Sequence, residues 1–214
     1  MTTKAVFFDA LGTLVELEPP WVHLAAELGI EPDESVVAAM RAEMAYYREH
    51  AHEAGYEARL ADLRAACAAL LTRELGRTVS VEQLLAAIRF RAYADAAPAL
   101  AGLRERGLAC ICVSNWDISL HDVLRRCGLD GLLDGVVVSA TAGASKPDPA
   151  IFAAALELAG CTAGEALHVG DTPVEDVDGA VAAGIPYLLL DRDASAGGED
   201  RIASLSEIDQ HLRT

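Results

Sequence analysis

Residues 5–13 read AVFFDALGT: four apolar residues run straight into an aspartate, and a turn containing a glycine follows. A short apolar run without polar alternation is typical of a strand that is buried on both faces, as in a parallel sheet. Asp9 then lies at the carboxyl end of that strand. Ligands of open parallel sheets bind beyond this edge, so the stretch indicates both a fold and the position of a site.

Four further apolar runs are of the same kind, at residues 109–113, 136–138, 166–169 and 186–190. Helical patterns separate the later runs. One begins with Asp148 as its N-cap and Pro149 in its first turn, and it ends at Gly160. Another spans residues 174–183 and ends at Gly184. Strands that alternate with helices predict an α/β fold: a mainly parallel sheet flanked by helices.

Residues 16–93 break this rhythm, because they contain no good strand candidate and show only helical periodicity. Breaks at residues 29–33, at Gly55 and at residues 76–80 divide the stretch into four helices. A segment of this length between two strands usually forms a subdomain over the site. We therefore expect a sheet-based core of residues 1–15 and 94–214 and a helical cap of residues 16–93.

The composition limits the possible partners and the compartment. Hydrophobic residues make up 52% of the 214-residue chain and charged residues 23%, which excludes a disordered protein. The net charge of −16 argues against nucleic acid and anionic membranes, which repel an acidic surface. No apolar run approaches the roughly 20 residues of a membrane span, and no cleavable leader precedes the first strand, so we expect a cytoplasmic protein. Cys110 and Cys112 alternate along a predicted strand and no C-x-x-C pair occurs, which favours cysteines as small core residues.

Polar side chains follow the other predicted strands as well. Ser114 and Asn115 end the second, Lys146 follows the third, Asp171 ends the fourth, and Glu175, Asp176 and Asp178 come next. The carboxyl ends of parallel strands converge, so these groups are expected to meet Asp9 at one edge of the sheet. Lys146 is one of only two lysines in the chain, and a compact amine suits a point contact to phosphate. We expect Glu175 and Asp178 to be solvated.

Four segments carry a resemblance: FFDALGTL at residues 7–14, ICVSN at 111–115, SKPDPAIF at 145–152 and HVGDTPVEDVDGA at 168–180. In this order, each at a strand end, they resemble the signature segments of the haloacid dehalogenase-like hydrolase superfamily. The inserted helices are similar to the cap of the subfamily that includes phosphoglycolate phosphatase-like enzymes and haloacid dehalogenases. The resemblance implies a Rossmann-like core with an inserted all-helical cap.

The resemblance also implies a nucleophile and a metal site. Asp9 would attack a phosphorylated substrate and form an aspartyl-phosphate. Asp9, the backbone carbonyl of Leu11 and Asp171 would hold Mg²⁺, with Asp176 supporting them from behind.

The remaining signature residues would bind the substrate. The hydroxyl of Ser114 and a neighbouring backbone N–H at Asn115 would donate to a phosphate oxygen. Lys146 would pair with both the nucleophile and the transferred group. The implied enzyme is a phosphatase-type hydrolase that acts on a small phosphorylated metabolite, as a monomer or a homodimer.

Leu11 departs from the family pattern. Phosphatases of the family carry a second aspartate two residues after the nucleophile, which protonates the leaving group and later activates water. A leucine cannot move a proton, and general acid–base help is typically a factor of about 10²–10⁴, roughly 3–5 kcal/mol of barrier. The sequence therefore supports the presence of the site, but it gives less support to efficient hydrolysis of phosphomonoesters.

Several interpretations of Leu11 stay open. The substrate has a good leaving group, such as an acyl phosphate, or the cap supplies the proton donor, for which His50 and His52 are candidates. Cap residues that could select a substrate include Arg41, Tyr46, Tyr47 and Arg48. Alternatively, the chain is a weakly active or non-catalytic binding or regulatory protein.

Two other members of the superfamily also lack the second aspartate. 2-Haloacid dehalogenases attack carbon without a metal, but they typically lack the Gly-Asp arrangement seen at Gly170 and Asp171. Phosphonoacetaldehyde hydrolase needs a cap lysine, and residues 16–93 contain no lysine, which excludes that reaction.

Overall fold

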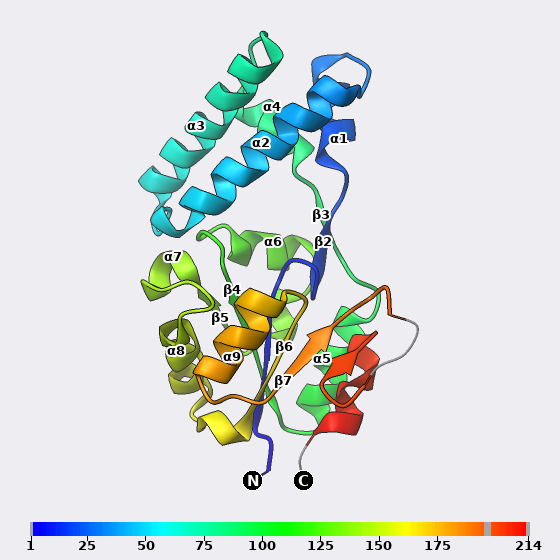
Figure 1. Cartoon of the computed structure of the whole chain (residues 1–214), viewed down its shortest axis with the longest axis vertical. Coiled ribbons are helices and arrows are strands. Elements are labelled where there is room, and N and C mark those ends of the chain that lie inside the picture. The colour runs from blue at the N-terminus through cyan, green and yellow to red at the C-terminus, as the bar shows by residue number, and fades with distance from the viewer. Residues whose placement is uncertain (1, 195–197, 213–214) are drawn as a thin grey trace.

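A computed structural model describes residues 2–194 and 198–212 and shows a sheet-based core below a separate group of helices (Figure 1). The core sheet has six parallel strands in the order β5-β4-β1-β6-β7-β8. The strands are β1 (Ala5–Phe8), β4 (Ala109–Ser114), β5 (Gly135–Val138), β6 (Ala166–Gly170), β7 (Tyr187–Leu190) and β8 (Arg201–Ile202). The five strands expected from the sequence, and the α/β fold class, are confirmed.

The two faces of β1 explain its unbroken apolar sequence. Ala5 and Phe7 pack on one face in a cluster with α8 (Pro149–Ala159) and α9 (Gly179–Ala182). Val6 and Phe8 pack on the other with α5 (Ala96–Glu105), α6 (Leu120–Arg126) and the 3₁₀ segment η5 (Leu205–His211). All four β1 side chains are fully buried. Burying a phenylalanine stabilises the fold by roughly 1.5–3 kcal/mol, so β1 is anchored from both sides and holds Asp9 in place.

Helix α8 begins and ends at the residues that the sequence indicates. Asp148 accepts from the backbone N–H of Ala150 at the start of α8, and Gly160 ends the helix with φ +62°. The expected single helix over residues 174–183 is wrong in part: Pro173–Asp178 (η4) forms a π-helical turn, and α9 completes the segment. Asp176 lies in this turn, and its carboxylate accepts from the backbone N–H of Thr172 just before it. Apolar periodicity cannot distinguish such a turn from an α-helix.

Four helices make up the inserted segment, as expected. They are α1 (Pro20–Leu28), α2 (Glu34–His50), α3 (Glu57–Leu75) and α4 (Val81–Ala87), with a short 3₁₀ turn η1 (Ala51–Glu53) between the longest two. They enclose a hydrophobic cluster of their own, which includes Leu24, Met40 and Leu71, all fully buried. We call these four helices and η1 the cap.

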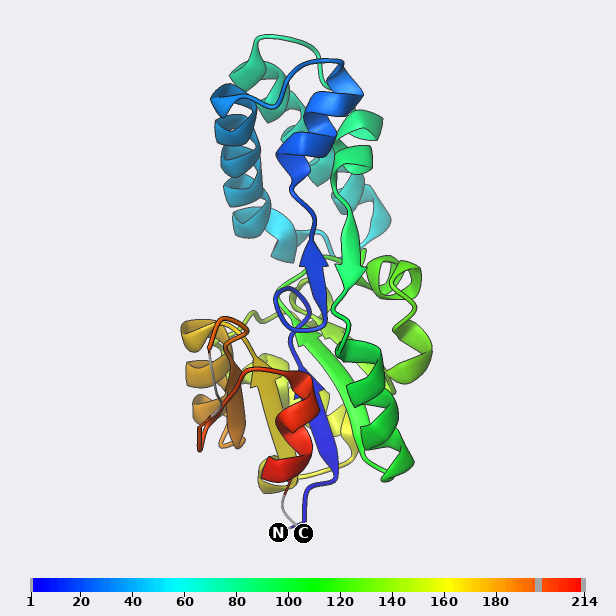
Figure 2. The ribbon, with the colours of Figure 1, turned by 90° about the vertical axis from the view of Figure 1, so that its right-hand side faces the viewer.

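The expectation that residues 16–93 contain no strand is wrong. β2 (Val15–Leu17) and β3 (Phe90–Ala92) pair antiparallel, and Figure 2 shows this two-stranded ribbon joining the cap to the core. Each strand has only three residues, too few for a periodic signal, and the pairing exists only once the two ends of the insertion meet. The division at residues 15/16 and 93/94 stays a prediction, and it falls at this ribbon.

Two further expectations concern the whole chain. The five cysteines are free, and Cys110 and Cys112 are buried in β4, which confirms them as core residues. Among the described residues, no helix has both the length and the apolar character that a bilayer crossing requires.

Candidate active site

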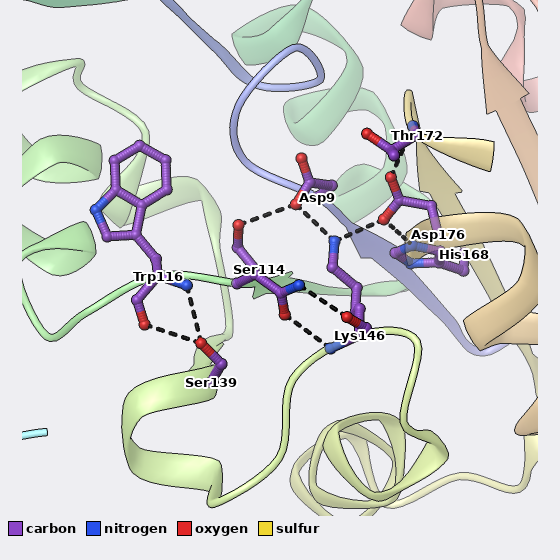
Figure 3. Close-up of polar contacts among 9 residues, drawn as sticks. Asp9, Ser114, Trp116, Ser139, Lys146, His168, Thr172 and Asp176 are labelled. Atoms are coloured by element: carbon purple, nitrogen blue, oxygen red, sulfur yellow. Dashed lines mark hydrogen bonds and ion pairs between the residues drawn. The ribbon is translucent and has the colours of Figure 1, made fainter. Parts of the chain in front are cut away.

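Figure 3 shows that the side chains of Asp9, Ser114, Lys146 and Asp176 meet at the carboxyl edge of the sheet. Asp9 follows β1, Ser114 ends β4, Lys146 precedes α8, and Asp176 comes from η4 after β6. Because β4, β1 and β6 are neighbours in the sheet, their carboxyl ends place these groups side by side. The convergence expected from the sequence therefore occurs.

Asp9 is held on one of its two carboxylate oxygens. Its Oδ1 accepts from Ser114 Oγ at 2.9 Å and from Lys146 Nζ at 2.6 Å. Burial raises the pKa of Asp9, and the ammonium of Lys146 works in the opposite direction. No described residue donates a hydrogen bond to Oδ2, so that oxygen remains for an electrophile or a cation.

Lys146 joins the nucleophile candidate to the acidic cluster. Its side chain has no exposed surface, and Nζ also donates to Asp176 Oδ1 at 2.6 Å. Burial works against the charge of the ammonium, but the two carboxylates outweigh it and raise the pKa of Lys146. The amine therefore stays charged at neutral pH and can bind an anionic group that approaches Asp9.

Asp176 has both oxygens engaged by the protein. Besides Lys146, Oδ1 lies 2.9 Å from Nε2 of His168, and Oδ2 accepts from the backbone N–H of Thr172 at 2.9 Å. Burial alone would raise the pKa of Asp176, but Lys146 and His168 lower it below its ordinary range. Because both oxygens already accept hydrogen bonds from the protein, Asp176 fits the expectation that it supports the metal ligands from behind.

His168 is a site residue that the sequence did not single out. It lies buried on β6, beneath the cluster, with its ring edge-on to Phe152 at 4.9 Å between centroids. Its apolar strand context makes it look like a core residue. Only the fold, which brings η4 back over β6, shows that it contacts Asp176.

Two glycines allow the acidic side chains to approach the backbone. A Cβ atom on Gly170 would overlap the carboxylate of Asp176, and one on Gly12 would overlap that of Asp171. Gly12 also has φ +85°, which side chains rarely adopt. The backbone of the turn after Asp9 therefore lies directly against Asp171.

The residues present fit a divalent cation. Ligand oxygens of Asp9, Asp171 and Asp176 all lie within 4.8 Å of one another. Asp171 Oδ1 is buried and has no hydrogen-bond partner among the described residues. Burial together with the charges of Asp9 and Asp176 raises the pKa of Asp171 to about 6. Oxygen ligands of this kind suit Mg²⁺, and a cation would satisfy the orphaned oxygen. Asp9 and Asp171 with the Leu11 carbonyl are the expected ligands.

Asn115 connects two of the signature segments. Its side-chain amide donates to the carbonyl of Lys146 at 2.9 Å and accepts from the Lys146 N–H at 2.7 Å. The side chain thus positions the loop that carries the ammonium. Substrate binding through the backbone N–H at Asn115 stays a prediction.

The other acidic residues of η4 differ from each other. Asp178 is exposed, as expected. Glu175 is half-buried, and burial raises its pKa while Lys146 opposes the shift. Glu175 is therefore partly shielded from water and interacts electrostatically with Lys146, so the expectation that it is solvated is wrong in part.

The cap contacts the core next to Ser114. Tyr47 Oη donates to Asp117 Oδ2 at 2.6 Å, and the backbone N–H of Ile118 donates to the carbonyl of Ala54 at 3.3 Å. Gly55 approaches the carbonyl of Ala140 so closely that a Cβ would collide with it. Of the candidate cap histidines, His50 stacks on Tyr46 and lies 2.8 Å from its carbonyl, and His52 is exposed. A proton-donating role for either histidine stays a prediction.

Fold and site together define a Rossmann-like α/β protein with a buried aspartate at the carboxyl end of its central strand and an inserted helical cap. Residues 3–184 match the haloacid dehalogenase-like hydrolases, and the chain belongs to that family.

Curated relatives match part of the chain. Haloacid dehalogenase-like hydrolase domain-containing protein 3 of Bos taurus is 43% identical over 91 residues, 42% of this chain and 36% of that protein. The phosphoserine phosphatase of Thermus thermophilus is 36% identical over 126 residues, 56% of this chain and 51% of that protein. The chain thus matches about half or less of the length of these relatives.

Solved structures match nearly the whole chain. A HAD phosphatase from Thermococcus onnurineus has a TM-score of 0.68 and 25% identity, with 97% of each chain covered. L-2-haloacid dehalogenase from Xanthobacter autotrophicus has a TM-score of 0.73 and 22% identity, also with 97% of each covered. The second likeness shows the fold alone.

Proposed function

We propose that this protein is a Mg²⁺-dependent phosphohydrolase that forms an aspartyl-phosphate at Asp9 and acts on small phosphorylated metabolites with good leaving groups. The observation that carries the proposal is the orphaned Oδ1 of Asp171 beside Asp9. A carboxylate with a buried, unpaired oxygen next to a second carboxylate is costly without a cation. The phosphatases among the similar proteins support the same reaction class.

The residues divide the first half-reaction between them. Ser114 and Lys146 bind the phosphoryl oxygens, and a carboxylate oxygen of Asp9 attacks phosphorus in line as the bond to the leaving oxygen breaks. The leaving oxygen takes the electron pair of that bond. Bound Mg²⁺, held by Asp9, Asp171 and the Leu11 carbonyl, would neutralise the phosphoryl charge.

Leu11 decides which substrates react. Its side chain is 40% exposed at the edge of the site and has no group that can donate a proton. The leaving group therefore departs as an anion, which favours acyl phosphates and aryl phosphates over alkyl phosphates. In the second half-reaction, water attacks the aspartyl-phosphate without a base at position 11, so we expect this step to be slow.

The test compares wild type with Leu11→Asp, and with Leu11→Asn as a matched polar control, on acetyl phosphate, p-nitrophenyl phosphate and alkyl phosphates, with and without Mg²⁺. We expect wild type to cleave only the activated substrates and only with Mg²⁺. Leu11→Asp should gain alkyl phosphates by about 10²-fold or more, and Leu11→Asn should not. Asp9→Asn should lose all turnover.

The alternatives give different results in the same assay. If wild type and Leu11→Asp both bind Mg²⁺ without cleaving any phosphate, the chain is a non-catalytic binding protein. If wild type hydrolyses 2-chloropropionate without Mg²⁺, it is a haloacid dehalogenase. The acidic cluster opposes the latter, because it would repel a carboxylate substrate.

A further inference from the structure

Arg192 makes an unusual set of contacts behind the candidate site. It follows β7, and its guanidinium donates to the carbonyl of Gly12 at 3.1 Å and to that of Thr13 at 2.7 Å. It also forms a two-pronged pair with Asp95, at 3.0 and 3.1 Å, and lies 3.7 Å above the ring centre of Tyr93. One side chain therefore joins the turn after the nucleophile to the segment that leaves the cap.

Arg192 binds the turn of residues 10–15, in which almost every backbone carbonyl accepts a hydrogen bond. Ala10 accepts from the N–H groups of Leu14 and Val15, Val15 accepts from Gly12, and Leu14 accepts from Tyr93. With Arg192 on Gly12 and Thr13, Leu11 is the residue in this turn whose carbonyl accepts no hydrogen bond from residues 2–194 and 198–212. The turn thus leaves one carbonyl for a ligand that the protein does not provide.

Asp95 keeps the guanidinium in one orientation. Its Oδ2 also accepts from Ser204 Oγ at 2.8 Å and from the backbone N–H of Leu205 at 2.9 Å. Burial opposes the charge of Asp95, but hydrogen bonds from Arg192, Leu205 and Ser204 outweigh it and lower the pKa. The carboxylate therefore stays ionised, and Arg192 is fixed before any substrate arrives.

We infer that Arg192 is a positioning residue, which holds the turn of residues 10–15 so that the Leu11 carbonyl faces the Mg²⁺ site. The inference rests on the proposed function. It depends on the close contact between Gly12 and Asp171, since the turn cannot shift without disturbing that carboxylate. Arg192 touches no reacting atom and acts only through the backbone that it binds.

Lysine cannot replace arginine here. The planar guanidinium serves a carboxylate and two carbonyls at once and stacks on an aromatic ring, whereas an ammonium is a single point charge. Arg192→Lys keeps the positive charge beside Asp95 but loses the planar arrangement of several N–H donors. It therefore tests geometry with less risk to folding than Arg192→Ala.

The experiment measures Mg²⁺ binding by titration calorimetry, without substrate, for wild type, Arg192→Lys and Arg192→Ala. Arg201→Lys is the matched control, because Arg201 pairs with Asp191 at 2.8 Å on the surface nearby. We expect Arg192→Lys to fold as wild type and to bind Mg²⁺ about tenfold or more weakly, as is typical when a residue that orients metal ligands is lost. Its kcat for acetyl phosphate should fall, and Arg201→Lys should match wild type in both measurements.

Two results would overturn proposals, and they can be told apart. If Arg192→Lys and Arg192→Ala, both folded, bind Mg²⁺ as tightly as wild type, Arg192 does not position the metal site. If wild type itself binds no Mg²⁺, the proposed function fails and this inference fails with it. If Arg192→Ala does not fold, Arg192→Lys alone decides the question.

Discussion

Lys146 shows how the site depends on single residues. Its ammonium lies between Asp9 and Asp176 with no exposed surface, so it neutralises two carboxylates that burial would otherwise make costly. The sequence indicated Lys146 because lysine is rare in this chain, and it indicated Asp9 and Asp171 because they follow buried strands. It could not indicate His168 or Arg192, since their partners lie on other elements and only the fold brings them together.

We expect Lys146→Met to lose turnover and to lower the free energy of unfolding by roughly 3–5 kcal/mol, because it leaves buried carboxylates unpaired. The loss should shrink at low pH, where the carboxylates take up protons. Urea unfolding at several pH values measures it. Lys4→Met, at the surface lysine that pairs with Glu165, is the control and should unfold like wild type. Equal stability of the two variants would contradict this account of Lys146.

Five of the six core strands were predictable because each is a short apolar run with a polar residue at its carboxyl end; the two-residue β8 is not such a run. The β2–β3 ribbon was not predictable, because three-residue strands carry no periodic signal and pair only through the tertiary fold. The cap is joined to the core by this ribbon, and its further contacts with the core include the hydrogen bond from Tyr47 to Asp117. This contact is a partly buried hydroxyl–carboxylate hydrogen bond, and Asp117 lies two residues after Asn115, so the position of the cap is linked to the loop that follows β4.

We expect Tyr47→Phe to loosen the cap, because it removes the donor to the buried Asp117 carboxylate, at a cost of roughly 1–3 kcal/mol. Amide hydrogen exchange in residues 117–119 and in the β2–β3 ribbon should become faster. Tyr56→Phe is the control, since Tyr56 is 58% exposed. Unchanged exchange in Tyr47→Phe would show that the other cap contacts suffice.

The acidic site lowers the stability of the whole folded chain. Burial, Asp9 and Asp176 raise the pKa of Asp171 from an ordinary 3.8 to about 6. The folded chain therefore holds a proton on Asp171 more tightly than the unfolded chain does. Between about pH 4 and pH 6 the free energy of unfolding falls as pH rises, and above that range the full penalty remains.

We expect Asp171→Asn to raise the unfolding temperature of the metal-free protein at pH 7 by a few degrees, since solvent screening reduces the penalty to about 1–2 kcal/mol. Mg²⁺ should stabilise wild type but not Asp171→Asn, and the stabilisation of wild type should fade below about pH 6 as Asp171 takes up its proton. Thermal unfolding with and without Mg²⁺ measures both effects. Asp178→Asn, at an exposed carboxylate, is the control and should keep the Mg²⁺ response.

The central claim is that Asp9 becomes phosphorylated, and trapping the phosphorylated chain tests it most directly. Wild type is mixed with acetyl phosphate and Mg²⁺, quenched in acid, and analysed by intact mass and peptide mapping. We predict one added phosphoryl group on the peptide that contains Asp9, none in Asp9→Asn, and less in Leu11→Asp because the restored carboxylate hastens hydrolysis. Turnover of acetyl phosphate without any phosphoryl group on that peptide, or with the group elsewhere, would contradict the account.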